Sequence, residues 1–122
     1  MAKILLVDDD VDVRYALGKY LHRAGHQVVE ATDGAQALSL MATEAFDLVI
    51  TDIVMPEADG IELILDIGRN TPGLPVIAIS GGGRLGRAEY LDMAQGLGAT
   101  AGLAKPVDPD ELLALIDRLL PR

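Results

Sequence analysis

Acidic residues directly follow two short apolar runs, where their carboxylates could act together. Asp8, Asp9 and Asp10 come after the first run, and Asp52 comes after the third. If both runs are strands of one parallel sheet, their carboxyl ends meet at the same edge. Crowded carboxylates disfavour one another's ionisation unless a cation compensates them. Because Mg²⁺ prefers oxygen ligands, the pattern predicts a hard divalent ion at this edge.

Other residue types at the same predicted edge suit a phosphoryl group. Ser80 and a run of glycines that begins with Gly81 follow the fourth apolar run, and Lys105 follows the fifth. A hydroxyl, backbone N–H groups and an ammonium can hold phosphoryl oxygens while one of the carboxylates attacks the phosphorus. The combination predicts phosphoryl transfer to an aspartate.

The elements that must position these residues form a repeated strand and helix pattern. Apolar runs alternate with segments of helical periodicity, which predicts five strands and five helices. The strands are expected at residues 4–7, 27–31, 46–51, 75–79 and 100–104. A helix between neighbouring strands makes them parallel, so the expected fold class is α/β, with helices on both faces of an open sheet. The length of 122 residues indicates one domain over 1–122.

Composition excludes several classes of protein. With 10 Lys and Arg against 19 Asp and Glu, the net charge of −9 argues against nucleic acid as a partner, because phosphate binding needs a basic surface. The absence of cysteine excludes disulfides and thiolate metal sites. The first apolar run is too short for a signal peptide or a membrane span, so we expect a cytoplasmic protein without membrane partners.

The motifs around these residues resemble those of the receiver domains of two-component response regulators. The similar segments cover essentially the whole chain in family order: 4–10, 49–56, 59–60, 80–81 and 105–106. The resemblance implies a flavodoxin-like, doubly wound sheet of five parallel strands in the order 2-1-3-4-5, with five helices. It also implies a phosphoacceptor switch that receives its phosphoryl group from a histidine kinase or a histidine phosphotransfer protein.

The resemblance assigns the acidic residues to phosphorylation and metal binding. Asp52 is implied as the phosphoacceptor. Asp9, Asp52 and the main-chain carbonyl of Val54 are implied as direct Mg²⁺ ligands, while Asp8 acts through a metal-bound water.

The remaining motif residues are implied to hold and sense the phosphoryl group. Ser80 is the implied switch hydroxyl, and the Lys105 ammonium and the Gly81 N–H bind phosphoryl oxygens. Pro106 sets the loop that follows, through a cis Lys105–Pro106 peptide bond.

The sequence departs from the family pattern at two places. Gly102 stands where most receivers carry an aromatic switch residue, so the usual inward rotation of a ring is unavailable and the loop at 81–86 becomes the candidate switch. Val54 and Gly82 lack the polar groups that often orient a hydrolytic water, which predicts slow self-dephosphorylation.

Two alternatives compete with the receiver interpretation. The acidic cluster, Ser80 and Lys105 also resemble the motif order of haloacid-dehalogenase-type phosphatases, with Asp8 as nucleophile, although no late acidic motif follows Lys105 at another strand end. The other alternative is an inert receiver-like interaction module.

We favour a single-domain signalling switch, which catalyses only its own phosphorylation and dephosphorylation, with a kinase docking near the first helix. The output is then protein binding or onward transfer of the phosphoryl group.

Overall fold

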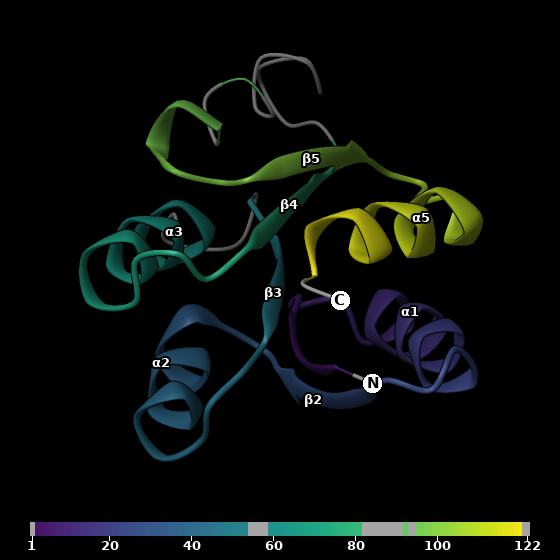
Figure 1. Ribbon diagram of the computed structural model, residues 1–122, viewed down its shortest axis with the longest axis horizontal. Coiled ribbons are helices and arrows are strands. Elements are labelled where there is room, and N and C mark those ends of the chain that lie inside the picture. The colour runs from purple at the N-terminus through teal and green to yellow at the C-terminus, as the bar shows by residue number, and fades with distance from the viewer. Residues whose placement is uncertain (1, 54–58, 82–91, 93–94, 121–122) are drawn as a thin grey trace.

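A five-stranded parallel sheet forms the centre of the computed structural model, which describes residues 2–53, 59–81, 92 and 95–120 (Figure 1). The strands are β1 (Lys3–Val7), β2 (Gln27–Ala31), β3 (Leu48–Asp52), β4 (Val76–Ser80) and β5 (Ala101–Ala104). Their order is β2-β1-β3-β4-β5, and every neighbouring pair is parallel. The predicted strand order and fold class are therefore confirmed.

Helices cover both faces of this sheet. They are α1 (Val11–Arg23), α2 (Gly34–Thr43), α3 (Asp59–Asn70) and α5 (Pro109–Leu119). Figure 1 shows α1 and α5 on one face and α2 and α3 on the other. Alternate residues of β1 point to opposite faces, as a strand requires: Ile4 packs with the α1 and α5 side chains, and Leu5 packs with those of α2 and α3.

The predicted helix between β4 and β5 lies largely outside the described residues. Asp92 and residues 95–97 are helical. The backbone at Gly98 has φ of 124°, a left-handed conformation that favours glycine and suits a helix end.

Two strand ends differ from the prediction in a way that matters for function. Asp52 and Ser80 are the last residues of β3 and β4 rather than the first residues after them. Each is paired in the sheet, Asp52 opposite Ile79 and Ser80 opposite Ala104, and each is buried. Because the sheet fixes their backbone, both side chains emerge from a rigid frame.

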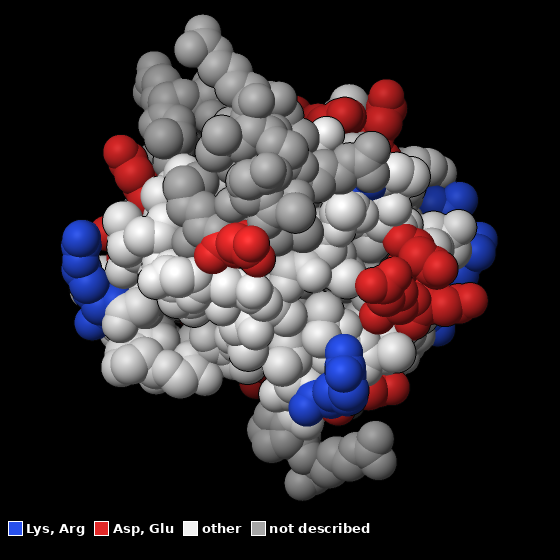
Figure 2. All heavy atoms as spheres, turned by 90° about the horizontal axis from the view of Figure 1, so that it is seen from above, with Lys and Arg blue, Asp and Glu red and all other residues white. Residues whose placement is uncertain are grey.

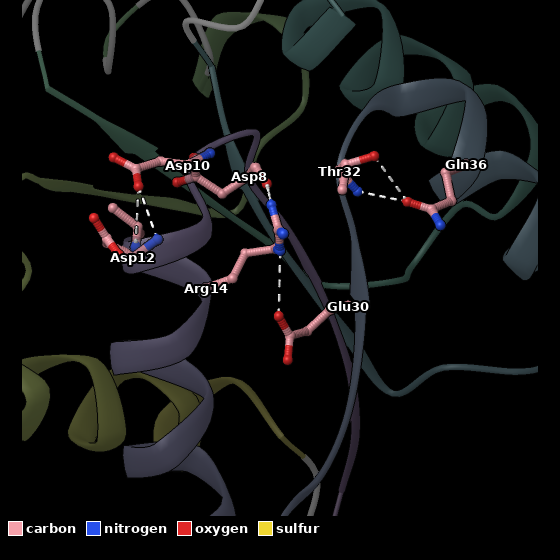
Figure 3. Close-up of polar contacts among 8 residues, drawn as sticks. Asp8, Asp10, Asp12, Arg14, Glu30, Thr32 and Gln36 are labelled. Atoms are coloured by element: carbon pink, nitrogen blue, oxygen red, sulfur yellow. Dashed lines mark hydrogen bonds and ion pairs between the residues drawn. The ribbon is translucent and has the colours of Figure 1, made fainter.

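Aspartates outside the site cap helices. Asp10 is the N-cap of α1 and accepts hydrogen bonds from the backbone N–H groups of Asp12 and Val13 (Figure 3). Asp33 and Asp108 cap α2 and α5 in the same way. These caps satisfy N–H groups that have no partner within their helix.

The surface reflects the acidic composition. Figure 2 shows acidic side chains gathered at the right of the face it presents, the side on which Figure 1 places α1 and the first turn of α5. That first turn carries Asp110 and Glu111. Across the described residues, no helix has the length and apolar character that crossing a membrane requires.

Candidate functional site

Three carboxylates converge where the carboxyl ends of β1 and β3 lie side by side. Asp8 and Asp9 follow β1, and Asp52 ends β3, its neighbour in the sheet. One oxygen atom from each of the three lies within 4.8 Å of the others. Asp8 and Asp52 are only 0% and 4% exposed, whereas Asp9 faces solvent. The structure thus brings together the acidic residues that the sequence predicts to meet.

Lys105 reaches this cluster from the end of β5. Its Nζ lies 3.0 Å from Asp8 Oδ2 and donates a hydrogen bond to Asp52 Oδ2 at 3.1 Å. The Lys105 backbone N–H is bonded to the Ser80 carbonyl oxygen at 2.8 Å, which fixes the start of the side chain. A Cβ added to Gly81 would lie 3.4 Å from Lys105 Cδ, so the lysine stem passes close over this glycine.

Burial and charge act in opposite directions on Lys105. Partial burial alone would lower the pKa of its ammonium. The contacts and negative charges of Asp8 and Asp52 outweigh burial, so the pKa is raised above its ordinary value of 10.5. Lys105 therefore remains a cation wherever these carboxylates are ionised.

The residues at this site fit a divalent cation. Among the described residues, the cluster sets three carboxylates against a single ammonium, which leaves negative charge uncompensated. Asp8 Oδ2 is fully buried and accepts no hydrogen bond from the described part of the chain, its contact with Lys105 being an ion pair without hydrogen-bond geometry. The Lys105 ammonium is shared between this oxygen and Asp52 Oδ2, so a metal cation that binds here would further stabilise the buried carboxylate.

The backbone around Asp8 is held from several sides. Its N–H donates to the Ala31 carbonyl oxygen at 3.2 Å, and its Oδ1 accepts from the Asp10 N–H at 2.9 Å. Its carbonyl oxygen accepts a 2.6 Å hydrogen bond from Arg14 Nη1 (Figure 3). Sequence reasoning missed Arg14, because a basic residue in the second turn of a helix gives no sign of which backbone group it contacts.

Gly60 allows α3 to begin directly behind Asp52. A Cβ at this position would collide with the Asp52 carbonyl oxygen and would lie 2.7 Å from Ile53 Cα. No side chain larger than hydrogen can be accommodated without a shift of the backbone. The glycine of the 59–60 motif therefore lets α3 begin in close contact with the end of β3.

The other predicted site residues that the structure describes lie at the same edge of the sheet. Ser80 ends β4 with a buried side chain, Gly81 follows it, and the Lys105–Pro106 peptide bond is cis, as expected. Gly102 lies in β5 opposite Ala78. Val54, the fourth predicted metal ligand, lies outside the described residues.

Sequence comparison places this geometry among known proteins. Residues 4–117 match the response regulator receiver domain family. The chain is 34% identical to sporulation initiation phosphotransferase F of Bacillus subtilis, over 98% of this chain and 94% of that protein. It is 40% identical to the transcriptional regulatory protein GlrR of Escherichia coli, over 98% of this chain and 26% of that protein. The chain spans 26% to 54% of the length of the first curated relatives that it matches.

Solved structures agree with the sequence match. The receiver domain of NtrX from Brucella abortus superimposes with a TM-score of 0.88 at 35% identity, covering 96% of this chain and 97% of that one. The chemotaxis response regulator CheY4 of Vibrio cholerae gives a TM-score of 0.85 at 31% identity, covering 98% and 99%. By sequence and by fold, the chain belongs to the response regulator receiver domain family.

Proposed function

We propose that this receiver is a cytoplasmic phosphoacceptor switch in which Asp52 takes a phosphoryl group from a phosphohistidine of a histidine kinase or phosphotransfer protein. The observation that carries the proposal is the buried Asp52 carboxylate, bonded to Lys105 and within 4.8 Å of Asp8 and Asp9. A carboxylate oxygen of Asp52 forms the new P–O bond. The P–N bond to the histidine breaks, and its electron pair returns to the imidazole.

The residues around Asp52 are suited to charge that develops on the transferring group. Asp8, Asp9 and Asp52, with the Val54 carbonyl, would hold Mg²⁺, which neutralises phosphoryl oxygens when it is bound. The Lys105 ammonium is already held beside Asp52, so it can bond a phosphoryl oxygen with little reorganisation. Ser80 and the Gly81 N–H lie at the end of β4, next to β3, and would bind the remaining oxygens.

The protein that donates the phosphoryl group would dock on α1. Among the described residues, the large apolar side chains that remain exposed all belong to this helix: Val11, Tyr15 and Tyr20. Tyr20 also lines a groove of about 490 Å³ between α1 and the segment after β5, and this groove extends to Lys105 and Gly81. Exposed apolar groups beside a reactive site are typical of a protein contact surface.

The output of the switch is a changed protein-binding surface or onward transfer of the phosphoryl group. A phosphoryl group adds nearly two negative charges beside Ser80 and the glycine-rich loop, which biases the equilibrium between loop arrangements. Because Gly102 has no side chain to rotate, we assign the switch to the loop at 81–86, of which residues 82–86 lie outside the described part of the chain.

Intact mass spectrometry after incubation with acetyl phosphate tests this function. We expect one added phosphoryl group that requires MgCl₂ and is lost in Asp52→Asn. Continuous turnover of acetyl phosphate that Asp8→Asn abolishes and Asp52→Asn preserves would instead support the phosphatase alternative. If neither modification nor turnover is observed, the result supports the inert interaction module.

A further inference from the structure

Arg14 connects the acidic site to α1 and to the edge strand β2 (Figure 3). Its Nη1 donates to the Asp8 carbonyl oxygen at 2.6 Å, and its Nε donates to Glu30 Oε1 at 3.2 Å. The Arg14 side chain is only 13% exposed. A guanidinium with so little contact with water needs such partners, and its two donors point to acceptors in two different segments.

The carbonyl that Arg14 binds belongs to the peptide group between Asp8 and Asp9. A peptide group is planar, so the direction of the Asp8 carbonyl also sets the orientation of the Asp9 N–H and of the chain that carries the Asp9 carboxylate. The Asp8 N–H and Oδ1 are already fixed by Ala31 and Asp10. Arg14 therefore holds the link between two of the three clustered carboxylates.

Glu30 orients the Arg14 guanidinium. It lies on β2 opposite Leu6 of β1, and its side chain is 49% exposed. A Cβ added to Gly18 would lie 3.8 Å from Glu30 Oε2, so the carboxylate rests against α1 at a position where the helix has no side chain. Because the Glu30 carboxylate is half exposed, its ion pair with Arg14 is partly screened by water and contributes little to stability, whereas it still orients the guanidinium.

We propose that Arg14, oriented by Glu30, is a positioning residue for Asp8 and Asp9, two of the carboxylates that would hold magnesium directly or through a bound water. The proposal rests on the metal site of the proposed function. By charge alone, a guanidinium close to a cation site opposes Mg²⁺ binding. By geometry, its hydrogen bond to the Asp8 carbonyl favours binding, because it sets the two carboxylates in advance. The two effects have opposite signs, so they can be separated by experiment.

The whole chain is titrated with MgCl₂ alone while its backbone amide chemical shifts are monitored. The shifts give the dissociation constant for Mg²⁺ without any phosphorylation. We expect Arg14→Met to weaken Mg²⁺ binding on the order of ten-fold, as is typical when an outer partner of a metal ligand is lost. Arg14→Lys retains the charge but cannot bond both acceptors, so it should also weaken binding. Glu30→Gln should weaken binding by a smaller factor.

Lys19→Met is the matched control. It removes the same charge from the same helix, but Lys19 lies over the Tyr15 ring, 5.1 Å from its centroid, rather than on the Asp8 backbone. We expect Mg²⁺ binding by this variant to be unchanged or slightly tighter. A second readout is phosphorylation by acetyl phosphate, in which the Arg14 variants should need more MgCl₂ for half-maximal rate yet approach the wild-type maximum.

The outcomes distinguish this proposal from the proposed function. If the Arg14→Lys and Glu30→Gln variants fold and bind Mg²⁺ as tightly as wild type, the positioning role is overturned. Tighter Mg²⁺ binding by Arg14→Met would also overturn it. Failure of the wild-type chain to bind Mg²⁺ would overturn the metal site itself. The amide spectra report folding in the same experiment.

Discussion

The Lys105 ammonium lies 3.0 and 3.1 Å from two buried carboxylate oxygens, one of Asp8 and one of Asp52. Lys105→Met would leave both carboxylates buried without their cation. We expect the free energy of unfolding at neutral pH to fall by about 3 kcal/mol, as is typical when one partner of a buried ion pair is removed. MgCl₂ should restore much of it, because the metal binds the same carboxylates in the folded state. Urea denaturation with and without MgCl₂ measures both effects.

Lys3→Met provides the comparison for that experiment. Lys3 pairs with Glu44 at 2.6 Å at the opposite end of β1, and both side chains are partly exposed. Loss of a surface pair should cost about 1 kcal/mol or less, and MgCl₂ should not change that cost. Equal losses for the two variants would mean that Lys105 does not balance the buried carboxylates.

A second prediction at the residue scale concerns Val54 and the lifetime of the phosphorylated state. A valine cannot orient a water for attack on the aspartyl phosphate, so we expect slow self-dephosphorylation. Val54→Asn should shorten the lifetime, by up to about 100-fold if the amide positions the water well. The decay of the phosphorylated mass after removal of acetyl phosphate measures the rate. Equal lifetimes would show that this position does not control hydrolysis.

Alanine substitutions at two glycines of α3 distinguish a local effect on helix stability from an effect on the site. Gly60→Ala places a Cβ against the Asp52 carbonyl oxygen, whereas a Cβ at Gly68 meets nothing within 4 Å. We expect Gly60→Ala to lower the free energy of unfolding by roughly 1–3 kcal/mol through overpacking. Gly68→Ala should raise it by up to about 1 kcal/mol, since alanine favours a helix more than glycine does. Urea denaturation compares the two, and a neutral Gly60→Ala would contradict the close contact behind Asp52.

The exposed face of α1 can be tested as the docking surface for the phosphodonor. Tyr15 is 66% exposed, and Tyr15→Glu should slow phosphotransfer from the most active member of a panel of autophosphorylated histidine kinases. Phosphorylation by acetyl phosphate, which needs no docking, should be unchanged. Arg69→Glu on α3, where the arginine side chain is 70% exposed, is the control and should affect neither donor. Equal transfer rates for wild type and Tyr15→Glu would exclude this face.

At the scale of the whole molecule, the sequence was sufficient to predict the architecture. Fully apolar runs and helical periodicity give the alternation of strands and helices, and the order 2-1-3-4-5 follows from the family resemblance. Because the sheet is parallel, aspartates separated by more than 40 residues in sequence meet at one edge. The convergence of Asp8, Asp9 and Asp52 was therefore predictable.

The finer contacts were not predictable, because they depend on side-chain conformations. Periodicity does not show that the Arg14 guanidinium turns back to the Asp8 carbonyl, or that Lys105 lies between two carboxylates. It also did not show that Asp52 and Ser80 are the last paired residues of their strands. These details decide how firmly the site is held.

Chemical trapping of the phosphorylated residue tests the central claim most directly. Borohydride reduces an aspartyl phosphate to homoserine, and peptide mass mapping then locates the modified position in the chain. After incubation with acetyl phosphate and MgCl₂, we predict homoserine at position 52 alone, and none when MgCl₂ is replaced by a chelator. Homoserine at position 8 or 9, or no homoserine in a fully folded protein, would contradict the assignment of Asp52 as the phosphoacceptor.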